Sequence, residues 1–205
     1  MSKDCCEKRI DADALRRQER RVLAIVLAIN LATFVLMVAA AIQGRSTSLL
    51  SGGLDNLGDA LTYAASLAVV GSTLQVKARV ALLKSALILF AAIAVAVQIA
   101  WRLAHPATPI FETIGIAALI NLAANIACLR LLHPYRHGDV NMASAWECSR
   151  NDVGEGLAVL VAGAGVWLFD SGWPDMLIAV ALLAMFLRSS FRVFSASLQG
   201  LRAPG

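Results

Sequence analysis

The stretch SLLSGGLDNLGDAL, residues 48–61, places two aspartates inside a segment that is otherwise mostly apolar or small. Asp55 and Asp59 are four residues apart, so an α-helix would bring both carboxylates onto one face. A charged side chain at the centre of a bilayer costs on the order of 2.5–3.5 kcal/mol on insertion scales. Two such residues in a membrane-type segment therefore predict a functional site inside a helix bundle.

The rest of the chain has the composition of a membrane protein. It is 205 residues long and 59% hydrophobic, with a mean hydropathy of +0.70, whereas soluble domains are about half apolar. The apolar residues fall into long blocks, and the length accommodates about six helical spans of roughly 20 residues each. We predict an all-α membrane protein, a bundle of six transmembrane helices, with no space for a sizeable soluble domain beside it.

The predicted transmembrane domain is residues 22–194, between a charged leader at residues 1–21 and a short tail at residues 195–205. The spans are expected at residues 22–43, 48–74, 85–103, 114–132, 143–168 and 176–194. Most Lys and Arg residues lie in the leader, the second and fourth connectors and the tail. The positive-inside rule then predicts that both termini are cytoplasmic in a multi-pass protein of the cell (inner) membrane.

Several function classes lack their signatures in this sequence. The net charge of +4 comes from basic residues at the ends of apolar blocks, so it indicates topology and not nucleic-acid binding. We find no nucleophile with a plausible base, no phosphate loop and no dinucleotide fingerprint, and therefore expect no enzyme. The cysteines do not form a secreted disulfide pattern and are expected to be reduced thiols: Cys5, Cys6, Cys128 and Cys148.

A second group of ligand-type side chains lies in WECSRNDVGEGLAV, residues 146–159. Cys148 and Asp152 are again four apart, and Glu155 follows on the same side. Facing helices would then offer four metal ligands, Asp55, Asp59, Cys148 and Asp152. Four ligands suit a tetrahedral ion such as zinc, and a thiolate favours zinc or cadmium over magnesium or calcium. Glu155 is interpreted as an accessory ligand, a proton carrier or a group that lines the groove.

The chemistry of these ligands predicts proton exchange. Carboxylates and thiols bind metals in the deprotonated state, so metal binding displaces protons. A site that exchanges protons for a divalent cation is the core of an antiporter. Three further polar residues in the spans are predicted to form contacts between helices: Gln98, Asn121 and Asn125.

The two motifs resemble those of the cation diffusion facilitators. SLLSGGLDNLGDAL is similar to that family's second-helix signature, in which an Asp-x-x-x-Asp pair binds the transported ion. WECSRNDVGEGLAVLVA is similar to the fifth-helix signature, His-x-x-x-Asp or Asp-x-x-x-Asp. The resemblance extends over roughly residues 23–194 and implies that Asp55, Asp59 and Asp152 are transport ligands. Cys148 departs from the usual His or Asp, which favours softer ions.

The resemblance also implies a homodimer that exports divalent transition metal from the cytoplasm in exchange for protons. We expect Zn²⁺ or a similar ion such as Cd²⁺, Co²⁺ or Fe²⁺ as the transported species, no other cofactor, and no nucleic-acid partner. The family usually carries a cytoplasmic domain after the sixth span, and a short form without it is expected here. Two alternatives are a non-transporting membrane metal-binding protein, as a sensor or partner subunit, and a proton or water pore.

Overall fold

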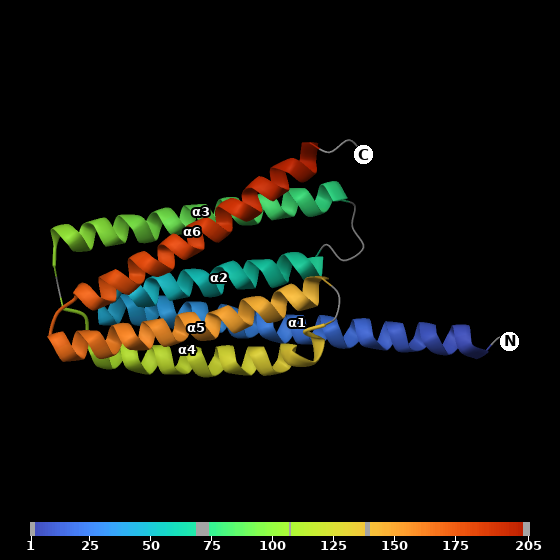
Figure 1. Cartoon of the computed structure of the whole chain (residues 1–205), viewed down its shortest axis with the longest axis horizontal. Coiled ribbons are helices and arrows are strands. Elements are labelled where there is room, and N and C mark those ends of the chain that lie inside the picture. Colours follow the sequence, from blue (N-terminus) through green and yellow to red (C-terminus); the bar gives the residue numbers. More distant parts are fainter. Residues whose placement is uncertain (1–2, 69–73, 107, 138–139, 203–205) are drawn as a thin grey trace.

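A computed structural model describes residues 3–68, 74–106, 108–137 and 140–202 of the chain. These residues form six α-helices and one short 3-10 helix: α1 (Lys3–Gly44), α2 (Thr47–Ala68), α3 (Leu74–Ala104), α4 (Phe111–Leu132), η1 (His133–Tyr135), α5 (Val140–Phe169) and α6 (Trp173–Arg202). The helices lie lengthwise beside one another (Figure 1). The predicted all-α bundle of six helices is confirmed.

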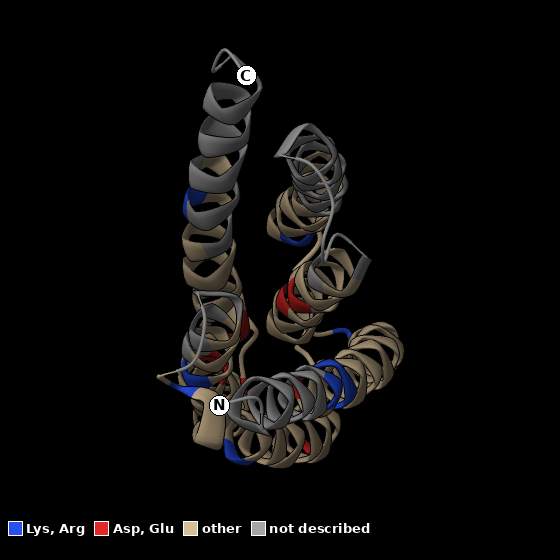
Figure 2. Cartoon of the chain, turned by 90° about the vertical axis from the view of Figure 1, so that its right-hand side faces the viewer, with Lys and Arg blue, Asp and Glu red and all other residues tan. Residues whose placement is uncertain are grey.

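The helices form a group of four with a pair beside it. α1 packs against α2 and α4, and α5 packs against α4 and α2. α3 and α6 contact each other and both contact α2 (Figure 1). The Lys3 end of α1 and the Arg202 end of α6 lie at the same end of the bundle, from which Figure 2 views the chain. α2 and α5 therefore connect the two groups, because α5 also contacts α6.

Several helices are longer than the spans predicted for them. The predicted leader is helical from Lys3, and α6 continues to Arg202 through most of the predicted tail. The connector predicted at residues 75–84 belongs to α3, which begins at Leu74. Span two was expected to reach residue 74, but α2 ends at Ala68, and residues 69–73 lie outside the described part. Arg, Lys, Glu and Ala are good helix formers, and an established helix extends readily, so polarity alone does not end it.

Three described helical stretches are long and apolar enough to cross a membrane: Arg17–Gly44, Phe111–Tyr135 and Cys148–Phe169. α3 and α6 contribute shorter apolar stretches, Ala92–Ala104 and Trp173–Met185. α2 carries Ser, Thr, Asn and Asp side chains that are mostly buried against the other helices. The length and composition of the apolar helices identify an all-α membrane protein.

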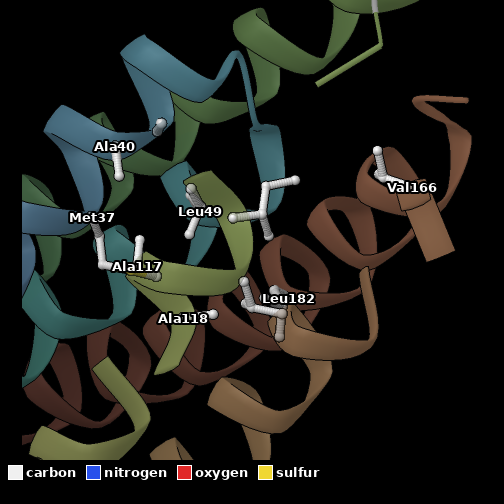
Figure 3. Close-up of a cluster of buried hydrophobic side chains, with 10 residues drawn as sticks. Met37, Ala40, Leu49, Ala117, Ala118, Val166 and Leu182 are labelled. Carbon is white, nitrogen blue, oxygen red and sulfur yellow. The ribbon is translucent and has the colours of Figure 1, made fainter. Parts of the chain in front are cut away.

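A buried apolar cluster joins five of the helices at one level of the bundle (Figure 3). Met37 and Ala40 come from α1, Leu49 from α2, and Ala117 and Ala118 from α4, while Val166 and Leu182 complete it from α5 and α6. Small side chains let the helices approach closely here.

One glycine shows how close that approach is. A Cβ atom added at Gly53 would lie 3.2 Å from Met37 Cβ, so α1 and α2 are in tight contact there. Gly163 gives α5 a similar contact with α4, where an added Cβ would lie 3.0 Å from Ile114 Cγ2. Glycine thus permits close helix packing at these positions, whereas a Cβ atom added at Gly154 would meet none of the described atoms within 4 Å.

The end of the bundle opposite Lys3 and Arg202 is held together by a buried carboxylate. Asp175, in the first turn of α6, is only 2% exposed. Its Oδ1 accepts hydrogen bonds from Ser46 Oγ at 2.6 Å and Ser48 Oγ at 2.5 Å, and its Oδ2 accepts one from Thr47 N at 2.6 Å. The N–H groups of a first helical turn have no partner within the helix. Asp175 therefore caps α2 from a different helix.

Candidate metal centre

Two neighbouring helices position the acidic side chains predicted to form the site. Asp55 and Asp59 project from consecutive turns of α2, and Asp152 lies on α5, which packs against α2. One carboxylate oxygen from each of these three residues lies within 4.8 Å of the other two. The structure thus brings together three of the four predicted ligands, and it places Asp152 beside two residues that are more than 90 positions away in the sequence.

The three carboxylates are largely removed from the surface of the protein. Asp59 is 8% exposed and Asp152 is 4% exposed, while Asp55 is half-buried. Asp152 Oδ2 is buried and has no hydrogen-bond partner among the residues that the structure describes. Buried polar atoms are normally satisfied by a protein group, water or an ion, so this oxygen is available to a ligand.

Cys148 and Glu155 flank the three carboxylates on α5. Cys148 is half-buried one turn before Asp152, with which it interacts electrostatically. Glu155 is half-buried and lies within hydrogen-bonding reach of the Asp55 carboxyl group. Among the described residues, neither belongs to the group whose ligand atoms all lie within 4.8 Å of one another. Their roles as fourth and accessory ligand stay predictions.

A comparison with protein families decides the class of protein that carries this site. The family model described as the cation efflux transmembrane domain matches residues 23–201. The chain belongs to the cation efflux family. This is the cation diffusion facilitator family, so the resemblance carried by the two motifs is confirmed. A search of curated proteins found no match.

The cation efflux domain is a multi-pass membrane domain of cation transporters. In this member, three anionic oxygen donors converge between α2 and α5. Carboxylates bind divalent cations such as zinc as well as harder ions, so the described donors alone do not select one metal. A thiolate at Cys148 would add the softer donor.

Two residues next to the carboxylates were not identified from the sequence of this cation efflux protein. Tyr63 is 1% exposed and donates a hydrogen bond from its hydroxyl group to Asp59 Oδ2 at 3.0 Å. Asn56 is also 1% exposed, and its Nδ2 donates to Asn121 Oδ1 of α4 at 2.8 Å. The helical spacing of Tyr63 and Asp59, four residues apart, is the signal that could have identified the first of them.

The polar side chains of α2 contact more than one neighbouring helix. Asp55 and Asp59 meet α5, whereas Ser51 Oγ donates to Ala179 O of α6 at 3.3 Å. Thr62 Oγ1 donates to Gly58 O of its own helix at 2.8 Å. The side chain of Ser66 lies outside the described part of the structure. The polar residues of α2 therefore serve both the metal centre and the contact with α6.

Proposed function

We propose that this cation efflux protein exports a divalent transition metal from the cytoplasm in exchange for protons, with Zn²⁺ or a similar ion such as Cd²⁺, Co²⁺ or Fe²⁺ as substrate. The observation that carries the proposal is the convergence of Asp55, Asp59 and Asp152 within 4.8 Å. Three neighbouring carboxylates repel one another unless a cation or protons neutralise them. A divalent ion between α2 and α5 removes that repulsion.

Cys148 is the proposed fourth ligand. Its position on α5, one turn before Asp152, supports this role. A thiolate completes a tetrahedral set of the kind that zinc prefers, and it increases the preference for soft ions over magnesium or calcium. Glu155, within hydrogen-bonding reach of Asp55, is proposed as an accessory ligand or as a group that carries protons.

Proton coupling follows from the chemistry of the ligands. The metal ion binds only after the carboxyl and thiol groups have released their protons. When the site is open to the cytoplasm, the ion enters and protons leave. When it is open to the other side, protons return to the ligands, their affinity for the ion falls, and the ion departs.

The orientation in the membrane is part of the same proposal. Lys3 of α1 and Arg202 of α6 lie at the end of the bundle that we place in the cytoplasm (Figure 1). Most Lys and Arg residues lie in segments at this end, as the positive-inside rule requires. We place the protein in the cell (inner) membrane as a homodimer with the divalent ion, protons and lipid as its partners.

The test is metal uptake into proteoliposomes with an imposed pH gradient, with internal pH recorded at the same time. Zn²⁺, Cd²⁺, Co²⁺, Fe²⁺ and Mn²⁺ would be compared for the wild type, Asp59→Asn and Cys148→His. The matched control is Asp170→Asn, since Asp170 is exposed in a turn with a φ of 44° that asparagine tolerates.

Metal flux with opposite proton movement, lost in Asp59→Asn but kept in Asp170→Asn, is the expected result. The Cys148→His profile should shift away from Cd²⁺ because a nitrogen donor replaces sulfur. Folded wild-type protein that binds metal without any flux would contradict transport and leave a metal-binding membrane protein. Proton flux without metal binding would instead indicate a proton pore.

A further inference from the structure

α4 supplies no carboxylate to the three-residue group, yet it contacts both helices that do. Asn121 Oδ1 accepts a hydrogen bond from Asn56 Nδ2 of α2 at 2.8 Å. Asn125 Nδ2 donates to the main-chain oxygen of Asp152 on α5 at 3.4 Å. Asn121 and Asn125 are four residues apart, so they lie on one face of α4, one turn from each other.

These contacts reach α2 and α5 at the residues of the metal centre. Asn56 follows Asp55 directly in the sequence, and the α5 acceptor is the carbonyl group of Asp152 itself. All three asparagines are almost fully buried, with exposed fractions of 1% for Asn56, 4% for Asn121 and 2% for Asn125. Displacement of either amide would therefore be transmitted to the backbone that carries the carboxylates.

The packing between α4 and α5 keeps this geometry tight. A Cβ atom added at Gly156, one turn after Asp152, would lie 3.3 Å from Leu122 Cδ1. Asn125 Oδ1 is buried without a hydrogen-bond partner among the described residues. The amide of Asn125 therefore keeps its bond to the Asp152 main chain although its own oxygen stays unpaired there, which buried polar atoms rarely do.

We propose that Asn121 and Asn125 are positioning residues that fix the separation of α2 and α5 and thereby determine the size of ion that the three carboxylates accept. The inference rests on the proposed function, because it assigns a specificity determinant to the same metal centre. The separation of oxygen donors must match the metal–oxygen distance, which is about 2.0–2.2 Å for zinc. A small change in helix spacing consequently alters the preference between Zn²⁺ and the larger Cd²⁺.

The experiment measures the affinity of the purified full chain for Zn²⁺ alone and Cd²⁺ alone by isothermal titration calorimetry, together with the thermal midpoint. The variants are Asn121→Ala, Asn125→Ala, Asn56→Ala and the double variant Asn56→Ala/Asn121→Ala. The control is Asn30→Ala, a buried asparagine of α1 whose Nδ2 donates to Val26 O of its own helix at 2.9 Å and to Cys128 Sγ of α4 at 4.0 Å, so its contacts are to neither of the helices that carry the carboxylates.

The α4 variants should weaken metal binding about tenfold, the lower end of what loss of an outer-shell partner costs a metal site. They should also change the ratio of Zn²⁺ to Cd²⁺ affinity several-fold. The double variant should be no worse than Asn121→Ala, because both changes remove the same hydrogen bond. Asn30→Ala should keep the wild-type ratio even where its thermal midpoint falls.

A merely structural role gives a different pattern. The inference would be overturned if the α4 variants had lower thermal midpoints but kept the wild-type affinities and the wild-type ratio of Zn²⁺ to Cd²⁺ affinity. It would also be overturned if Asn30→Ala changed that ratio equally. Either result would leave the proposed function intact. Failure of the folded wild type to bind either ion would overturn the proposed function and the inference together. If Asn121→Ala does not fold, Asn121→Ser, which keeps an oxygen acceptor on a shorter side chain, provides the same comparison.

Discussion

Asp175→Asn tests whether a carboxylate of α6 stabilises the start of α2. The substitution keeps the shape of the side chain but exchanges one acceptor oxygen for an NH₂ donor. If the remaining oxygen keeps its hydrogen bonds to Ser46 and Ser48, the new NH₂ group takes the place of Oδ2. It then faces the Thr47 N–H group, whose nitrogen lies 2.6 Å from Asp175 Oδ2 in the wild type. One charge-assisted hydrogen bond is then lost and one buried N–H group has no acceptor.

The magnitude follows from these contacts. A hydrogen bond to a charged group contributes about 1.5–3 kcal/mol, and the lost interaction with the helix dipole adds about 0.3–1 kcal/mol. The expected destabilisation is therefore about 2–4 kcal/mol, which corresponds to a fall of about 5–15 °C in the thermal midpoint for a chain of this size. The measurement is thermal unfolding of purified protein in detergent, followed by size-exclusion chromatography of heated samples.

Two comparisons make the result interpretable. Asp170→Asn removes an exposed carboxylate from the turn that precedes α6 and should leave the midpoint close to that of the wild type. Asp175→Ala removes both acceptor oxygens and should be at least as destabilising as Asp175→Asn. A fall of less than about 2 °C in both Asp175 variants would refute the capping argument.

Three further predictions concern the metal centre and the packing of the helices. Tyr63→Phe removes the hydrogen bond to Asp59 and should weaken Zn²⁺ binding about tenfold in calorimetry; unchanged affinity would show that Asp59 needs no such partner. Wild-type affinity for Zn²⁺ should fall as the pH is lowered, because protons compete with the metal ion for the ligands, and a flat profile would contradict carboxylate ligation. Gly53→Ala should destabilise the fold by about 1–3 kcal/mol because the added Cβ atom would meet Met37. At Gly115 an added Cβ atom would meet none of the described atoms within 4 Å, so Gly115→Ala should be neutral or stabilising. Equal thermal midpoints in the two variants would contradict the close α1–α2 contact.

The convergence of Asp55, Asp59 and Asp152 could be predicted because it depends on local periodicity. A spacing of four residues determines which side chains share a helix face, and the cost of buried charge indicates that such faces meet. The count of six helices was predictable for a similar reason, since apolar blocks of span length are visible in the sequence.

Other features depend on contacts that local periodicity does not reveal. The hydrogen bonds of Asp175 are made to residues 46–48, more than 120 positions away, and no local spacing indicates them. The hydrogen bond from Ser51 to the main chain of α6 likewise joins residues 128 positions apart. The ends of α1, α3 and α6 were missed because polar residues that favour helix formation resemble a connector in a hydropathy pattern.

The close contacts at Gly53 and Gly163 have a practical consequence for following the protein at work. α1 lies tightly on α2, and α4 lies tightly on α5, while the three carboxylates lie between these two pairs. Spectroscopic labels placed on α1 and α2 would therefore keep a constant separation during transport. Labels placed on α2 and α5 would lie on either side of the three carboxylates, so an optical sensor of metal occupancy is best built on this pair, with the α1–α2 pair as its reference.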